Sequence, residues 1–103
     1  MEPVSRSQLL ERARKGLVTV LDVRPIEEYA AGHIPGAINV PLKELSKRLH
    51  EFKRNRQIVA YYRGPYCVLA FDAVAKLRAQ GFDARRLEEG FPEWRRADLP
   101  IAT

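Results

Sequence analysis

The residues that could carry chemistry in this sequence gather in a short polar loop that ends in its lone cysteine. The loop consists of Tyr62, Arg63, Gly64, Pro65, Tyr66 and Cys67. It follows an apolar run at residues 58–61 and precedes an apolar helix pattern, so its backbone amides are expected around a helix start. Such amides stabilise oxyanions and favour the thiolate of Cys67, as a nucleophile or sulfur carrier. A small thiol that packs in the core is an equally weighted alternative.

Four further polar residues could support chemistry at this loop. Asp22 and Arg24 follow a strand pattern, so they either face the pocket or form an ion pair at its rim, and the ion pair is favoured. The same choice between a pocket residue and a structural role applies to Glu28. His33 can titrate near neutral pH, but it stands in a turn between a helix and a strand, where we expect it to brace the turn by hydrogen bonding.

Strand and helix patterns alternate along the chain and must position these residues. Short apolar runs predict strands over residues 18–23, 37–40, 58–61 and 84–87. Helices are predicted from the Ser5 capping box to Gly16, over residues 25–31, along the face formed by Leu42, Leu45, Leu49 and Phe52, after the loop as far as Gly81, and from Pro92 around Trp94. The helix after the loop is expected to bury Val68, Ala70, Phe71, Val74, Ala75 and Leu77. This order predicts a mainly parallel α/β sheet that is covered on both faces, with functional groups where strands end.

Length and composition narrow the function classes. The 103 residues suit a single domain over residues 1–103, and a lone cysteine and two histidines predict neither a disulfide nor a metal or other cofactor. No apolar stretch approaches the roughly 20 residues of a membrane span, and no secretory signal is evident, so a cytoplasmic protein is expected. The net charge is +5, with a basic run over residues 43–56 that is interpreted as a solvated helix face rather than a nucleic-acid site.

Several longer motifs resemble one known family. LDVR at residues 21–24, the pair Glu28 and Tyr29, GHIPGAINVP at residues 32–41 and EEGFPEW at residues 88–94 are similar to the signatures of rhodanese domains, although Glu89 stands where a glycine is usual. The resemblance implies a sheet of about five mainly parallel strands with helices on both faces. It also implies that residues 62–67 form the active-site loop.

One position departs from the family pattern. Active rhodaneses carry the catalytic cysteine at the first loop position, where this chain has Tyr62, and a phenol cannot hold a persulfide. The segment YYRGPYCVLAFDAV also resembles a bacterial subgroup found behind an arsenic-repressor-type winged helix, whose loop has cysteines at both ends. We therefore expect sulfur-transfer activity to be reduced or absent.

Two alternatives stay open at this point. Cys67 could act as a persulfide carrier, with Arg63 attracting a small anionic sulfur donor such as thiosulfate or a persulfide. The domain could instead be a regulatory module that senses an anion or a reactive sulfur species and reports to a fused or partner DNA-binding domain. Direct binding of nucleic acid or membrane is not expected.

Overall fold

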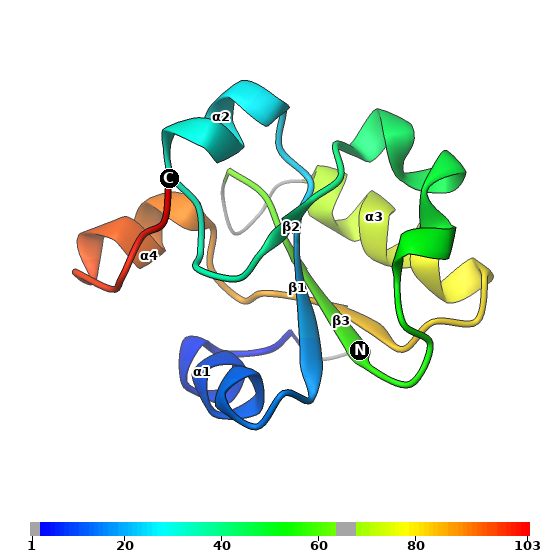
Figure 1. Ribbon diagram of the computed structural model, residues 1–103, viewed down its shortest axis with the longest axis horizontal. Coiled ribbons are helices and arrows are strands. Elements are labelled where there is room, and N and C mark those ends of the chain that lie inside the picture. The colour runs from blue at the N-terminus through cyan, green and yellow to red at the C-terminus, as the bar shows by residue number, and fades with distance from the viewer. Residues whose placement is uncertain (1–2, 64–67) are drawn as a thin grey trace.

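A parallel sheet forms the centre of the molecule in the computed structural model, which describes residues 3–63 and 68–103. Within these residues the sheet has four strands in the order β2-β1-β3-β4 (Figure 1). The strands are β1 (Val18–Asp22), β2 (Ile38–Asn39), β3 (Gln57–Tyr61) and β4 (Ala84–Arg86). All three pairings are parallel, as the alternation of strands and helices predicts.

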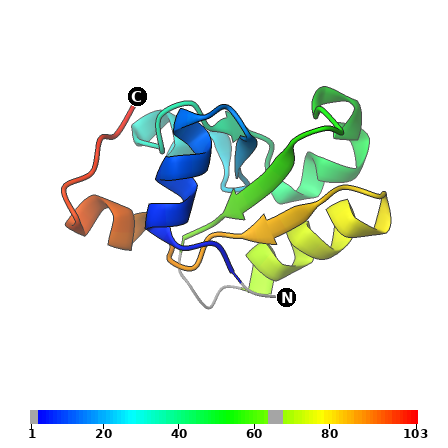
Figure 2. The same cartoon turned by 90° about the horizontal axis from the view of Figure 1, so that it is seen from below.

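Helices cover both faces of this sheet. They are α1 (Arg6–Arg14), α2 (Ile26–Ala31), α3 (Val68–Ala79), α4 (Phe91–Arg96) and the 3₁₀ segments η1 (Leu42–Lys47) and η2 (Leu49–Glu51). One apolar cluster joins α1 and α4 to the sheet, and a second joins α3, η1 and the segment after it to the other face (Figure 2). The predicted α/β architecture is therefore confirmed. None of these helices has the length and apolar character that crossing a bilayer requires.

The alternation of side chains along β3 places neighbouring residues on opposite faces of the sheet. Ile58 and Ala60 pack in the cluster with α3, whereas Val59 and Tyr61 pack in the cluster with α1 and α4. Tyr62 continues this alternation and joins the α3 cluster. Tyr61 and Tyr62 therefore face opposite sides of the sheet, although they are neighbours in the chain.

The single helix predicted along Leu42, Leu45, Leu49 and Phe52 is wrong. The chain forms two short 3₁₀ segments instead, with Arg48 between them at φ −115° and ψ 17°. Apolar spacings of three and four residues fit one face of an α-helix, but a spacing of three also fits 3₁₀ turns. Arg48 lies within reach of both Glu44 and Glu51 and forms ion pairs with each.

The prediction that Phe71 and Ala75 are buried is also wrong. Phe71 is 48% exposed, and Ala75 is exposed as well. The side of α3 that packs on the sheet is formed by Ala70, Ala73, Val74 and Leu77. Phe71 lies outside this buried side of the helix, at the solvent-exposed surface. The guanidinium of Arg86 lies over the Phe71 ring, 4.6 Å from its centroid, and covers part of it.

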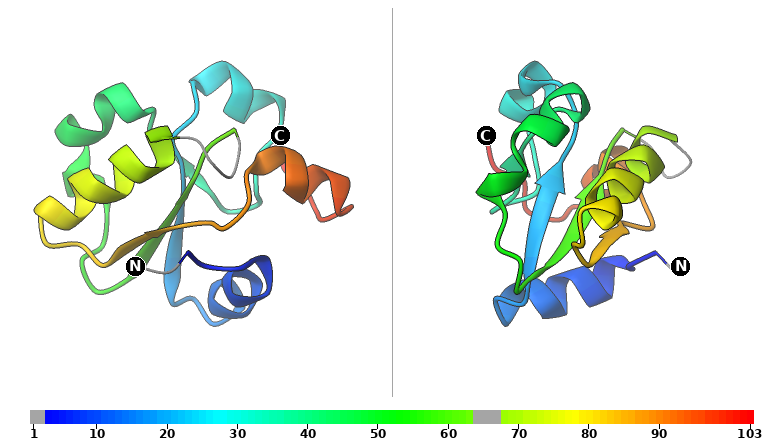
Figure 3. Two further views of the ribbon diagram at one scale, coloured as in Figure 1. Left: turned by 180° about the vertical axis from the view of Figure 1, so that it is seen from behind. Right: turned by 90° about the vertical axis from the view of Figure 1, so that its right-hand side faces the viewer.

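Within the described residues the sheet has four strands, against the five or so that the resemblance implies. Val4 forms one parallel bridge with Leu87 beside β4, and the described segment before α1 lies next to β4 in both views of Figure 3. The ladder stops there because Ser5 already caps α1: its amide donates to Gln8 and its hydroxyl accepts from the Gln8 amide. Pro3 has no amide hydrogen with which to extend the ladder on the other side.

Removing the α1 cap gives a first prediction. Ser5→Ala is expected to lower the free energy of unfolding by about 1 kcal/mol, because the Gln8 amide loses its acceptor at the helix start. Chemical denaturation would measure the change. Ser7→Ala, an exposed serine in the same helix, is the matched control, and an equal loss in both variants would contradict a capping role for Ser5.

Candidate functional site

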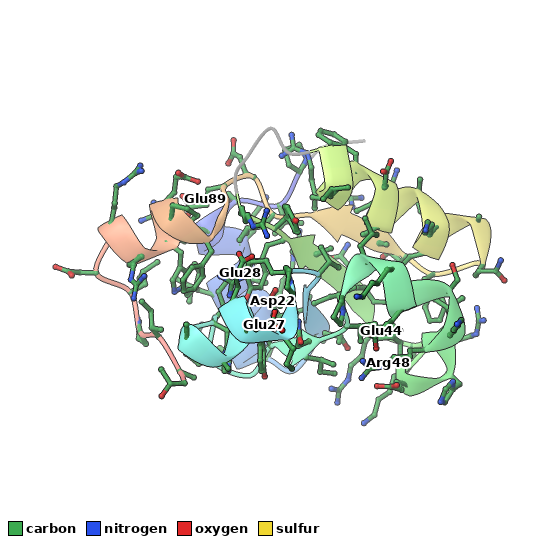
Figure 4. All side chains as sticks on the ribbon, turned by 90° about the horizontal axis from the view of Figure 1, so that it is seen from above. Asp22, Glu27, Glu28, Glu44, Arg48 and Glu89 are labelled. Carbon is green, nitrogen blue, oxygen red and sulfur yellow. The ribbon has the colours of Figure 1, made fainter. Side chains whose placement is uncertain are left out.

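Functional groups gather at the carboxyl ends of β1 and β3, where the strand order reverses. The chain proceeds from β1 to β2 on one side and from β3 to β4 on the other, so a crevice is expected between the ends of β1 and β3. Asp22 and Tyr61 are register partners at these ends. Figure 4 looks onto this edge and labels Asp22, at the end of β1, together with Glu27 and Glu28, which both belong to α2.

Asp22 and Arg24 form a buried ion pair beneath the site. Asp22 is fully buried and Arg24 is 4% exposed, and the guanidinium donates from Nη2 to Asp22 Oδ2 over 2.7 Å. Arg24 Nη2 also donates to the carbonyl of Gly32, and the guanidinium stacks on Phe91. Burial works against the charge on Arg24, but hydrogen bonds and attraction from Asp22 outweigh it, and the net pKa of Arg24 is raised.

Tyr61 and Asn39 complete this network. The Tyr61 hydroxyl donates to Asp22 Oδ2 over 2.7 Å and accepts from the Ile34 amide, so it ties β1 to the turn before β2. Burial raises the pKa of Tyr61 far above its ordinary value, and the charge of Asp22 raises it further. The Asn39 side chain donates to the backbone carbonyls of both Asp22 and Arg24. The network therefore fixes the backbone at the end of β1.

Tyr62, the first loop residue, has its side chain in the apolar cluster with α3. It is 7% exposed, and its carbonyl accepts from the amide of Phe91 over 3.1 Å. The Arg63 guanidinium lies 5.1 Å from the centre of the Tyr62 ring. The remaining predicted loop residues, Gly64, Pro65, Tyr66 and Cys67, lie outside the described residues.

Arg63 and Glu28 form a two-pronged ion pair across the site. Arg63 Nε lies 2.8 Å and 2.9 Å from the two Glu28 oxygens, and its Nη2 also bonds Oε2. The hydrogen bonds from Arg63 lower the pKa of the Glu28 carboxyl, partial burial opposes them, and the charges of Arg63 and Arg24 lower it further. The carboxylate of Glu28 is thus paired with Arg63, the first cation of the loop.

His33 lies in the turn after α2. Its Nδ1 is 2.7 Å from the carbonyl of Tyr29, its ring stacks on the Tyr29 ring, and its backbone bridges to Ala102. The contacts tie α2 to the end of the chain. Within residues 3–63 and 68–103, no group of three or more His, Cys, Asp and Glu side chains could hold a metal ion.

Two cavities flank α2. The larger, of about 470 Å³, is lined by Tyr62 and lies between α2, the start of η1 and α3. The smaller, of about 180 Å³, is lined by Arg24, Glu28, Phe91 and Arg95, among others. Both cavities combine apolar walls with charged residues, which are Glu27, Lys43, Glu44 and Lys76 in the larger one and Arg24, Glu28 and Arg95 in the smaller one.

Comparison with known proteins assigns the family. Residues 5–97 match the family model described as rhodanese-like domain. The chain belongs to the rhodanese-like family.

Rhodanese-like relatives include both regulators and enzymes. An HTH-type transcriptional regulator of Mycobacterium tuberculosis is 54% identical over 100 residues, which are 97% of this chain and 44% of that protein. A sulfurtransferase of Allochromatium vinosum is 33% identical over 85 residues, covering 82% of this chain and 78% of that one. The structure of a human single-domain sulfurtransferase matches with a TM-score of 0.80 and 26% identity, over 93% of this chain and 96% of that chain. The chain spans less than half of the mycobacterial regulator's length.

Sequence reasoning missed two contributors to this rhodanese-like site. Tyr61 was assigned only to a strand, although alternation along that strand turns it away from Tyr62 and toward Asp22. Asn39 carries no titratable group, so nothing in the pattern marked it, yet it binds two carbonyls of the β1 end. A search for polar residues at the ends of neighbouring strands would have found both.

The ion pair of Glu28 predicts a pH-dependent contribution to stability in this rhodanese-like domain. A carboxyl whose pKa is lowered by folding stabilises the folded state above its unfolded pKa, about 4.3, and loses this effect as pH falls through the folded pKa. Glu28→Gln is therefore expected to cost up to about 1 kcal/mol at pH 7, since both partners are partly exposed, and nearly nothing well below pH 4. Denaturation of both proteins across pH would measure it, and an equal cost at every pH would exclude the electrostatic account.

Proposed function

We propose that this chain is a rhodanese-like sulfur-transfer scaffold whose transfer activity is strongly reduced or absent. The observation that carries the proposal is the buried phenol of Tyr62 directly after β3, at the position that the family pattern gives to the nucleophile. The sulfurtransferase likeness of its relatives supports the scaffold.

The chemistry explains why this residue decides the activity. In transfer from thiosulfate, a cysteine thiolate attacks the outer sulfur, the S–S bond of thiosulfate breaks, and sulfite leaves with the electron pair. Cyanide then takes the sulfane sulfur from the persulfide as thiocyanate and restores the thiolate. A phenol oxygen offers no sulfur on which a persulfide can form, so the cycle has no first step at Tyr62.

The test compares the unchanged chain with Cys67→Ser in a thiosulfate:cyanide assay. We expect both proteins to form thiocyanate no faster than a protein-free blank. Turnover by the unchanged chain that is lost in Cys67→Ser would contradict the proposal and would make Cys67 the persulfide carrier.

A second candidate function is regulation. The 54% identity to an HTH-type transcriptional regulator supports a module that binds an anion or a reactive sulfur species for a fused or partner DNA-binding domain. Arg24, Arg95 and Glu28 line the smaller cavity, and Arg24 is held by Asp22 and by the Gly32 carbonyl, so Arg95 is the cation that a small anion would meet there. Titration calorimetry with thiosulfate tests it: saturable binding without turnover supports the sensor, and no binding contradicts it.

A further inference from the structure

Most of the positive charge of this chain is concentrated in one segment, residues 42–56, which we call the basic lobe. The segment contains six basic and two acidic side chains, so it carries a net charge of +4 out of the +5 of the whole chain. Residues 1–41 have no net charge, and residues 57–103 contribute +1. An uneven distribution of this kind produces a local positive potential that attracts a polyanion.

The basic lobe is not the solvated helix face that the sequence indicated. Its chain forms η1 and η2 and then a turn at residues 53–56 that leads into β3. Leu45 and Phe52 anchor it in the apolar cluster with α3. Arg54 is held as well: its Nη1 donates to the Gln80 carbonyl over 2.6 Å, and its guanidinium lies 4.2 Å from the centre of the Phe82 ring. The lobe is therefore a packed part of the domain rather than a loose basic tail.

The acids on and around the basic lobe neutralise only part of its charge. Arg48 is shared between Glu44 and Glu51, so these three side chains together carry one negative charge (Figure 4 labels the first pair). Lys43 lines the larger cavity together with Glu27 of α2, which offsets it. The neighbouring segment of residues 68–83 holds two basic and two acidic side chains. Counted together with Glu27 and this segment, the lobe keeps a net charge of +3.

Four cations of the basic lobe remain available to a partner. They are Lys47, Lys53, Arg54 and Arg56, and within the described part of the chain none of them forms a salt bridge. The first three are exposed and Arg56 is half-buried. Arg56 lines a hollow beside the end of α1, and the described residues of that lining include no acid.

The exposed side chains of the basic lobe are all polar. Ser46, His50 and Asn55 accompany the charged residues, whereas Leu42 and Leu49 are half-buried. Protein–protein contacts centre on apolar or aromatic anchors and are depleted in lysine, and unpaired bases stack on aromatic side chains. A duplex backbone needs neither, because Lys, Arg, Ser and Asn side chains contact its phosphates. The lobe therefore suits a duplex better than a protein or a single strand.

We propose that the basic lobe contacts the phosphate backbone of duplex DNA through Lys47, Lys53, Arg54 and Arg56. The contact reads no bases, so it contributes affinity and orientation rather than sequence preference. The inference rests on the second candidate function, because a fused or partner DNA-binding domain holds the lobe at a high effective concentration beside DNA. A backbone contact that is weak on its own becomes effective under this condition.

Fluorescence anisotropy of a labelled DNA duplex of about 20 base pairs, titrated with this chain between about 20 and 150 mM NaCl, tests the proposal. Four phosphate contacts predict a slope of about −3.6 when the logarithm of the association constant is plotted against the logarithm of the salt concentration. Lys47→Gln/Lys53→Gln is expected to make this slope shallower by about two and to weaken binding at least about ten-fold at the lowest salt concentration. If the double variant is unfolded, the two single variants replace it, each with a change of slope of about one.

The matched control is Arg95→Gln/Arg96→Gln, which removes the same charge from exposed positions on α4, outside the basic lobe. It is expected to weaken duplex binding less than about three-fold, because only the overall charge of the chain changes. Three results would each overturn the inference: no binding of the duplex at the lowest salt concentration, equal weakening in the two double variants, or equally tight binding of a polyglutamate chain of matched charge, which would assign the lobe to an acidic protein.

Failure of this inference and failure of the functions proposed above are distinguishable. Duplex binding is measured without a sulfur donor, so its absence leaves the inactivity attributed to Tyr62 untouched. Saturable binding of thiosulfate without binding of the duplex would support the sensor and overturn only the contact with DNA. Thiocyanate formation by the unchanged chain would contradict the proposed function, whatever the duplex shows.

Discussion

Tyr62→Cys is expected to give this chain thiosulfate:cyanide sulfurtransferase activity at least about 100-fold above that of the unchanged chain, because it supplies the missing nucleophile. The backbone that would hold the new thiolate is already fixed. The Tyr62 carbonyl accepts from the Phe91 amide, and β3 pairs in register with β1 up to the preceding residue, Tyr61. Thiocyanate formation at saturating donor measures the gain.

Tyr62→Ser is the matched control for that variant. Both substitutions remove the same buried ring from the α3 cluster, so both are expected to destabilise the fold by a similar amount, about 2–4 kcal/mol. Only the thiol can hold sulfane sulfur. Activity in the serine variant, or none in a folded cysteine variant, would contradict the role assigned to this position.

Asp22→Ala is expected to give the largest loss of stability, about 3–5 kcal/mol, because it leaves the charge of Arg24 buried and without its carboxylate partner. The Tyr61 hydroxyl loses its acceptor in the same variant. Denaturant unfolding measures the loss. Glu51→Ala, which breaks a more exposed ion pair with Arg48, is the control and should change stability far less.

A double variant separates the buried charge from lost packing. Asp22→Ala/Arg24→Met removes both charges, so it is expected to recover about 2 kcal/mol of the loss in Asp22→Ala. A double variant less stable than Asp22→Ala would contradict the electrostatic account. The additional loss of stability would then be assigned to the missing stacking of Arg24 on Phe91.

Much of the fold follows from local signals in the sequence. The Ser5 and Gln8 pair marks the start of α1, as predicted, and Pro25 is the N-cap of α2, one position before the first turn in which it is predicted. The buried run at residues 18–23 contains β1 because strands covered on both faces have nearly continuous apolar sequence. The parallel order then follows from the alternation of strands and helices.

The errors arose where local patterns fit more than one structure. Spacing alone did not distinguish 3₁₀ turns from an α-helix between Leu42 and Phe52. The position of Phe71 depends on how α3 is rotated on the sheet and on Arg86, which comes from a distant strand. Tertiary contacts determine both the 3₁₀ segments and the exposure of Phe71, and nothing in the neighbouring sequence indicates those contacts.

The sequence predicted where the loop residues Tyr62 and Arg63 lie relative to the strands, but only some of the contacts around them. The motifs place Tyr62 and Arg63 after β3, where the structure has them. The pairing of Arg63 with Glu28 joins residues 35 positions apart, and the larger cavity is assembled from segments that follow β1, β2 and β3. Neither feature has a signature in any one stretch of sequence.

The most direct test of the central claim is the intact mass of each protein after treatment with thiosulfate and removal of excess donor. Tyr62→Cys/Cys67→Ser is predicted to gain about 32 mass units, the mass of one sulfur atom, whereas the unchanged chain gains none. A gain of this size on the unchanged chain that disappears in Cys67→Ser would contradict the account, because sulfur would then be carried by Cys67 with Tyr62 in place.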